Sequence, residues 1–381
     1  MSSHWMTRPT SLFRGGSQVE NFREMATIYP VRVIRRASTV APFEPGAPTE
    51  LPATFEFQGK RLDTAQFLSE METTGLLVLK DGRVVFERYW HGYDETTQAA
   101  SWSVGKSFVS ALLGVAIDDG AIGSVEDQVT QYAPMLNKPG GAYDGVRIKD
   151  VLQMSSGARW SEDYSDPESD IGRWGRVLSG GGSIDAFAAE CVRGCEPGTF
   201  NRYNSTDTHV LGMVLRGATG RSLTEYLREK LWEPLGAEAD AFWVVDSTGT
   251  EMAAGGLNAV LRDYARLGEL YRNGGVWRAR RIVSEAWVKA SVTPDAPHLM
   301  PGPRPTALLP WGYGYQWWVP DTSGAFSALG VYNQLVWVDP PTRTVIAQTA
   351  AFRRYGADLR PESYRTADCF AFCRAIADAN Q

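Results

Sequence analysis

The sequence predicts an α/β protein in which a helical insertion divides one sheet domain. Two strand-like runs and a helix come first, a turn-rich helical region follows, and three strand-like runs and a final helix come last. We expect the sheet domain over residues 56–120 and 251–381, the helical insertion over 121–250, and an extended N-terminal arm over 1–55. Because binding sites often form between domains, an active site is expected at the seam between sheet and insertion.

The first elements are a hairpin and a helix. Apolar runs flank Asp81-Gly82 on both sides, and this dipeptide between such runs indicates a two-residue hairpin turn. Apolar residues then recur at helical spacing from Ser103 to Ile117. Gly120 stands where a left-handed residue would end that helix.

Periodicity also predicts the later elements. Residues 148–154 and 223–235 have helical patterns, and residues 257–271 form a well-patterned amphipathic helix that Gly274-Gly275 closes. The last elements expected are strands at 313–319, 331–338 and 344–350 and a helix at about 363–377.

The composition limits which classes of partner and which cellular compartment we expect. The 381 residues are 43% hydrophobic and 22% charged, as in globular proteins, and no run approaches the ~20 apolar residues of a membrane span. A net charge of −6 argues against nucleic acid or an anionic membrane as partner. Residues 1–16 lack the apolar run of a signal peptide, so a cytoplasmic protein is expected. The pairs Cys191/Cys195 and Cys369/Cys373 lack the usual zinc spacing, and neither metal nor cofactor is expected.

Ser103 and Lys106 form the strongest candidate for chemistry. On a helix, residues three apart have Cβ atoms roughly 5–6 Å apart, so the hydroxyl and the amine lie side by side. A serine needs an adjacent base to act as a nucleophile. A lysine can be that base when its environment lowers its pKa.

Two other interpretations use nearby residues. Gly105-Lys106-Ser107 resembles the end of a phosphate-binding loop, but that loop needs glycine where this chain has Ala100. His209 is the best placed of the four histidines for a serine-protease-like triad, although its helical context predicts a packing residue.

Further motifs accompany the Ser103 tetrad in a recognisable order. They lie at 152–157, 196–205, 254–266 and 328–331. In order and spacing this set resembles the serine β-lactamase and penicillin-binding protein superfamily over roughly residues 70–375. The resemblance is closest to class C β-lactamases, family VIII carboxylesterases and 6-aminohexanoate-dimer (nylon oligomer) hydrolases. It implies a β-lactamase-like fold, with an antiparallel sheet flanked by helices and an inserted all-helical region.

The resemblance implies roles for specific residues. Ser103 is the nucleophile, and Tyr203, in a Pro-Gly-x-x-x-x-Tyr context, is the catalytic tyrosine. The backbone N–H groups of Ser103 and Val331 form the oxyanion hole. Either Lys106 or Tyr203 takes the proton of Ser103, and the phenol is expected to ionise more easily beside a lysine cation.

Departures from the family pattern bear on the substrate. The family's strand motif carries a cation, whereas this chain has Ala328-Leu329-Gly330. The resemblance places Ala328 and Gly330 beside the substrate, and the uncharged Ala328 implies weak β-lactam hydrolysis. Ser205 stands where class C enzymes have asparagine, and Tyr-x-Ser is similar to the nylon oligomer hydrolases.

The stretch 161–167 contains a Glu-Asp-Tyr sequence that also resembles those hydrolases. The resemblance implies that Tyr164, Asp170 and Trp174 bind substrate. Asp170 could meet an ammonium group or simply cap a helix, and the two aromatic residues could instead pack beneath a loop.

These observations predict a serine hydrolase that cleaves carboxylic esters and linear amides through an acyl-enzyme on Ser103. One alternative is an amide hydrolase of the 6-aminohexanoate-oligomer type. Another, of a different class, is a non-catalytic module that binds acyl compounds or peptides. The expected partner is a small ester or amide substrate, and neither nucleic acid nor a membrane is expected to bind. The protein could also form a homodimer.

Overall fold

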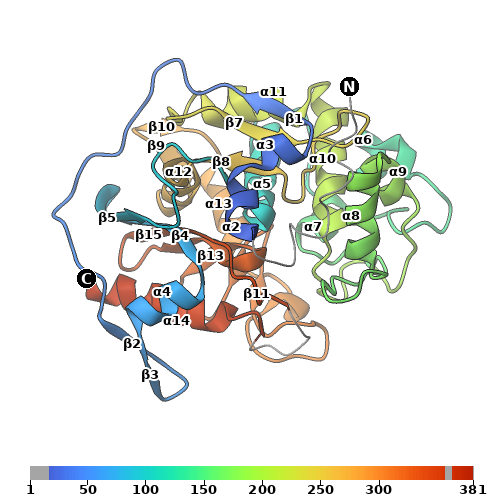
Figure 1. Cartoon of the computed structure of the whole chain (residues 1–381). Coiled ribbons are helices and arrows are strands. Elements are labelled where there is room, and N and C mark those ends of the chain that lie inside the picture. Colours follow the sequence, from blue (N-terminus) through green and yellow to red (C-terminus); the bar gives the residue numbers. More distant parts are fainter. Residues whose placement is uncertain (1–16, 357–362, 381) are drawn as a thin grey trace.

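A seven-stranded antiparallel sheet forms the centre of the protein (Figure 1). The computed structural model describes residues 17–356 and 363–380. The strand order is β11-β12-β13-β14-β15-β4-β5. The bounds are β4 Thr73–Lys80, β5 Arg83–Tyr89, β11 Gly312–Tyr313, β12 Trp318–Val319, β13 Phe326–Gly330, β14 Gln334–Asp339 and β15 Thr344–Ala350.

Segments far apart in the sequence meet inside this sheet. Strand β4 pairs with β5 through the predicted turn, where Asp81 and Gly82 have φ of 52° and 75°. On its other side β4 pairs with β15, so that Leu77 faces Ala347. The hairpin is therefore built into the sheet that the C-terminal strands form.

Helices cover both faces of the sheet, as Figure 1 shows. Helix α12 (Leu261–Arg272) packs on one face, and α4 (Thr64–Glu70) and α14 (Thr366–Ala379) pack on the other. Side chains of β4 alternate between them: Leu77 and Leu79 join the core on the α12 side, whereas Leu76 and Val78 join the core with α14. The predicted antiparallel sheet flanked by helices is confirmed.

Helix α5 (Gly105–Asp118) runs through the core beside this sheet. It follows a 3₁₀ turn, η2 (Trp102–Val104), so the α-helix begins at Gly105 and the predicted start at Ser103 falls in the turn. Gly120 has φ of 76°, which confirms the left-handed end.

Most remaining helices lie on the side of the molecule away from α14 (Figure 1). They are α6 Val129–Tyr132, η3 Pro134–Leu136, α7 Ile148–Leu152, α8 Asp170–Gly180, α9 Ile184–Ala189, α10 Ser205–Thr219, α11 Leu223–Leu227 and the π-helical turn η4 Arg228–Trp232. The smaller elements elsewhere are β2 Thr54–Phe57, β3 Lys60–Asp63, β9 Val276–Trp277, β10 Arg280–Arg281, α13 Glu285–Val292 and η5 Pro297–Leu299. No helix within the described ranges has both the length and the apolar character that crossing a bilayer requires.

A second, four-stranded sheet corrects two expectations. Its order is β1-β7-β8-β6, and its bounds are β1 Val31–Ile34, β6 Ala99–Ala100, β7 Ala241–Val244 and β8 Leu257–Ala259. Strand β7 lies within 121–250, so that region is not helical to its end. The predicted N-terminal arm also contains α2 (Gln18–Arg23) and α3 (Met25–Ile28) ahead of β1. Pairing with distant strands, rather than local pattern, makes β1 and β7 strands.

Three other boundaries differ for similar reasons. Residues 257–259 were expected in a helix, but they pair with β7 and β6, and α12 begins at Leu261. The predicted strand at 313–319 is divided into β11 and β12 by a turn in which Gln316 has φ of 64°. The predicted strand at 331–338 begins with a 3₁₀ turn, η6 (Val331–Asn333).

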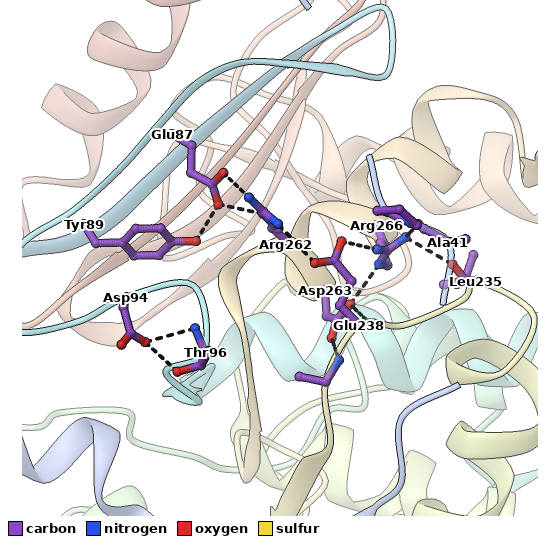
Figure 2. Close-up of polar contacts among 12 residues, drawn as sticks. Ala41, Glu87, Tyr89, Asp94, Thr96, Leu235, Glu238, Arg262, Asp263 and Arg266 are labelled. Carbon is purple, nitrogen blue, oxygen red and sulfur yellow. Dashed lines mark hydrogen bonds and ion pairs between the residues drawn. The ribbon is translucent and has the colours of Figure 1, made fainter. Parts of the chain in front are cut away.

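Buried ion pairs and hydrogen bonds connect α12 to the neighbouring segments (Figure 2). The Arg266 side chain is 1% exposed, and its Nε donates to Asp263 Oδ1 at 2.8 Å. The same guanidinium donates to the carbonyls of Ala41 and Leu235 and to Glu238. Removing one partner of such a buried set would leave a charge uncompensated, so the contacts fix where α12 meets the N-terminal segment.

Candidate active site

A cavity of about 1200 Å³ lies between the η2 turn, α8 and the N-terminal helix α3. Five of the residues proposed from sequence line it, namely Ser103, Tyr164, Trp174, Ser205 and Val331. Met25 and Tyr29 also line it, and sequence reasoning missed both because they lie in the expected arm.

Lys106 and Ser103 are in contact at the edge of this cavity. Lys106 Nζ donates to Ser103 Oγ at 2.8 Å, to Ser205 Oγ at 3.2 Å and to the Ala254 carbonyl at 2.6 Å. These three bonds satisfy an ammonium group. A neutral amine would keep two donors, for Ser205 and Ala254, and would turn its lone pair toward the Ser103 hydroxyl.

Burial prepares Lys106 to accept a proton. The side chain comes from the first turn of α5, and the residue is 2% exposed. Loss of hydration disfavours the charged form and lowers the pKa of Lys106 to about 8, while the negative charge of Glu162 acts in the opposite direction. A fraction of the lysine is therefore neutral near neutral pH.

Tyr203 lies beside Lys106, just ahead of α10. Its ring stacks on Trp318 with centroids 5.3 Å apart, and Lys106 Nζ lies 5.3 Å from the centroid of the Tyr203 ring. Burial, followed by Glu162, raises the pKa of Tyr203 well above its ordinary value, and a hydrogen bond with Ser103 opposes this. The expectation of an easily ionised phenol is therefore wrong, because burial and Glu162 keep the phenol neutral.

Glu162 is a functional candidate that sequence reasoning missed. Its carboxylate accepts hydrogen bonds from Ser205 and Tyr164, both 2.6 Å from Oε1, and from the Trp160 indole. The sequence places Glu162 two residues before Tyr164. That spacing is a local signal, but it does not show that the carboxylate turns toward Ser205, 43 residues later.

The end of strand β13 lies against the η2 turn. A Cβ atom at Gly330 would lie 3.1 Å from Ser103 N and 2.6 Å from the Ser101 carbonyl oxygen, so only glycine permits this approach. Val331 follows directly and lines the cavity together with Ser103. The two backbone N–H groups expected to bind an oxyanion thus belong to adjoining segments.

Three residues expected beside the substrate do not line the cavity. Ala328 is fully buried in the core that includes α5, because alternate residues of β13 face that core. Gly330 contacts the backbone of η2 instead. Asp170 is the first residue of α8, pairs with Arg173 and accepts a hydrogen bond from Ser161 N at 2.8 Å. The cap of α8 is Ser169, whose side chain accepts from Gly172 N, so the alternative of a capping role for Asp170 is wrong as well.

Trp174 lies in the cavity wall with an unused donor. The residue is 3% exposed, and among the described residues its indole Nε1 has no hydrogen-bond partner. The nitrogen itself is buried, so a molecule in the cavity would meet the apolar part of the Trp174 ring rather than this donor.

The two competing interpretations do not agree with the geometry. Lys106 is enclosed by protein groups, and Ser107 Oγ donates to the Gln316 carbonyl at 2.7 Å, so neither is free to hold a phosphate. The buried His209 on α10 places Nε2 2.7 Å from Oδ1 of the partly buried Asp185 on α9, as expected of a packing residue.

Comparison with known proteins shows the family of the chain. The family model described as Beta-lactamase matches residues 64–365. The chain is 31% identical over 340 residues to a 6-aminohexanoate-dimer hydrolase of Paenarthrobacter ureafaciens, covering 87% of this chain and 84% of the relative.

Solved structures share the fold. A Bacillus anthracis protein provisionally named as a 6-aminohexanoate-dimer hydrolase superposes with a TM-score of 0.85 at 22% identity, over 97% of this chain and 96% of that one. A family VIII carboxylesterase gives a TM-score of 0.59 at 16% identity, over 82% and 95%. The family match and the 31% relative each span most of the sequence, so the chain belongs to the β-lactamase family of serine hydrolases.

Proposed function

We propose that this enzyme hydrolyses carboxylic esters and linear amides through an acyl-enzyme on Ser103. The observation that carries the proposal is the buried Lys106 Nζ, 2.8 Å from Ser103 Oγ at the wall of a large cavity. Lys106 takes the hydroxyl proton while Oγ forms a bond to the substrate carbonyl carbon. The carbonyl π electrons move to oxygen, and the N–H groups of Ser103 and Val331 stabilise that charge.

Tyr203 completes the proton transfers. As the neutral phenol it gives its proton to the leaving alkoxide or amide nitrogen, and it regains a proton from the Lys106 ammonium. The C–O or C–N bond breaks and the acyl group stays on Ser103. Water then attacks the acyl carbon, its proton passes to the same pair, and Ser103 recovers its hydrogen as the acid leaves. Because the two groups pass one proton between them, they act as a unit in the catalytic cycle.

An amide hydrolase of the 6-aminohexanoate-oligomer type is the second candidate. The relative at 31% identity has that activity in its name. Tyr164, which belongs to the Glu-Asp-Tyr stretch that resembles those hydrolases, lines the cavity and supports the candidate. The Asp170 carboxylate, by contrast, is engaged with Arg173 and cannot be counted as a binding site for an ammonium group.

A substrate panel with a covalent probe tests the proposal. Ser103→Ala should abolish turnover of p-nitrophenyl butyrate and labelling by a fluorophosphonate, whereas Ser110→Ala, the same change deeper in α5, should retain both. The 6-aminohexanoate dimer and nitrocefin complete the panel. Labelling at Ser155 or Ser156 would contradict the assignment, and a non-catalytic binder would give no more than one turnover.

We also propose that the protein is cytoplasmic, and the formation of a homodimer stays a prediction. The four cysteines are free thiols, which suits a reducing compartment. Cell fractionation tests the location. Size-exclusion chromatography with light scattering tests the assembly, since a monomer of 42.0 kDa and its dimer are readily separated.

A further inference from the structure

The Glu162 carboxylate is surrounded by donors. The Trp160 indole and the Ser205 backbone N–H donate to Oε2, and the hydroxyls of Ser205 and Tyr164 donate to Oε1. Two of these groups are N–H donors that cannot accept. Four donors on one carboxyl group suit the ionised form, which only accepts.

The direction of the Ser205 hydroxyl follows from its two neighbours. Lys106 Nζ donates to Ser205 Oγ at 3.2 Å, so the hydroxyl hydrogen is free to point to Glu162 Oε1 at 2.6 Å. Together with the bond between Lys106 and Ser103, this makes a continuous chain from the nucleophile to a carboxylate. Such a chain orients the amine and places a negative charge beyond it.

We propose that Glu162 is a positioning residue for the hydrolysis. Through Ser205 it holds Lys106 toward Ser103 and stabilises the positive charge that Lys106 gains with the serine proton. Through Tyr164 it also fixes part of the cavity wall. This inference rests on the proposed function, because it requires Lys106 to be the base.

The charges around Lys106 determine what the loss of Glu162 would do. Burial lowers the pKa of Lys106 to about 8, and Glu162 acts to raise it. The other titratable groups on which Glu162 acts are largely uncharged near neutral pH, because burial raises the pKa of each: the phenols of Tyr164, Tyr203, Tyr313 and Tyr355 and the carboxyl of Asp207.

These charges determine the direction in which the pH profile moves when Glu162 loses its charge. Neutral Lys106 is the active base, so kcat/KM rises with pH through the pKa of Lys106 and is level above it. Without the charge of Glu162 that pKa falls further, and the rising limb of the plot of kcat/KM against pH moves to lower pH. A residue that merely packs the loop would reduce the rate without moving the limb.

The experiment compares pH profiles of kcat/KM for p-nitrophenyl butyrate. Glu162→Gln, which keeps the size and loses the charge, should move the limb down by about one pH unit and lower kcat. Glu162→Asp should keep the limb, and Glu190→Gln, the same neutralisation at an exposed site, should match the wild type. A limb in Glu162→Gln that stays in place or moves up overturns the inference.

Two measurements separate the possible failures. If Glu162→Gln does not fold, Ser205→Ala interrupts the same chain, and it should move the limb in the same direction by a smaller amount. An unmoved limb in that variant also overturns the inference. Fluorophosphonate labelling of wild-type Ser103 tests the proposed function separately: labelling with an unmoved limb refutes only the role of Glu162, and no labelling refutes the function itself.

Discussion

Gly330 lies directly against the backbone of Ser103. A Cβ atom added at Gly330 would meet Ser103 N at 3.1 Å and the Ser101 carbonyl oxygen at 2.6 Å, and the latter contact is with backbone that cannot rotate away. The relative position of the two oxyanion donors therefore depends on a glycine at the end of β13, although this residue does not line the cavity.

Gly330→Ala should separate Val331 from Ser103 and misplace one oxyanion donor. Losing one such donor typically costs ~2.7–4 kcal/mol of transition-state stabilisation, so kcat for p-nitrophenyl butyrate should fall by about 10²- to 10³-fold. Circular dichroism and thermal unfolding would show whether the fold is retained. A folded variant with wild-type kcat would contradict this placement of the oxyanion hole.

Lys106 and Tyr203 should behave as one unit. Lys106→Ala removes the base and Tyr203→Phe removes the proton donor to the leaving group, so each should lose most of kcat. Because either loss interrupts the same proton transfers, the double variant should be little worse than either single one. A double-mutant cycle on kcat measures this, and fully additive losses would argue for independent roles.

Asp207 should make stability depend on pH. Its buried Oδ1 accepts from Ser156, Tyr143 and Asn204, and burial raises the pKa of Asp207 to about 8. The folded state therefore keeps a proton that the unfolded state loses above about 4. This contribution is complete below that pH and is lost as the pH rises through about 8.

Asp207→Asn lacks this titration. Its unfolding free energy relative to the wild type should rise between pH 5 and 7.5, by at most about 1.4 kcal/mol per pH unit. Urea unfolding of both proteins at several pH values measures the difference. A difference that is constant with pH would show that Asp207 is ionised in the folded protein.

Several parts of this protein follow from local sequence. The Asp81-Gly82 turn needs two residues with positive φ, and the dipeptide itself supplies them. Ser103 and Lys106 meet because they are three residues apart where the chain turns into α5. The strand at 344–350 was predicted with its observed bounds, since its apolar run is short and is bounded by turn residues.

Other features were decided by contacts between distant segments. Ala328 lies in a strand whose pairing turns its methyl into the core, so Ala328→Lys would bury an ammonium there and destabilise the protein rather than extend the cavity. The cavity wall contributed by Met25 and Tyr29 exists because β1 pairs with β7 and carries α3 to the site.

The sequence by itself thus determined the family, the nucleophile–lysine pair and most elements of the sheet, because each depends on spacings of a few residues. Only the tertiary structure decided that Glu162 faces Ser205, that Asp170 begins a helix, and that burial keeps Tyr203 protonated while it lowers the pKa of Lys106. The burial of a side chain and the charges around it depend on segments that are far apart in the sequence, so no local sequence pattern predicts them.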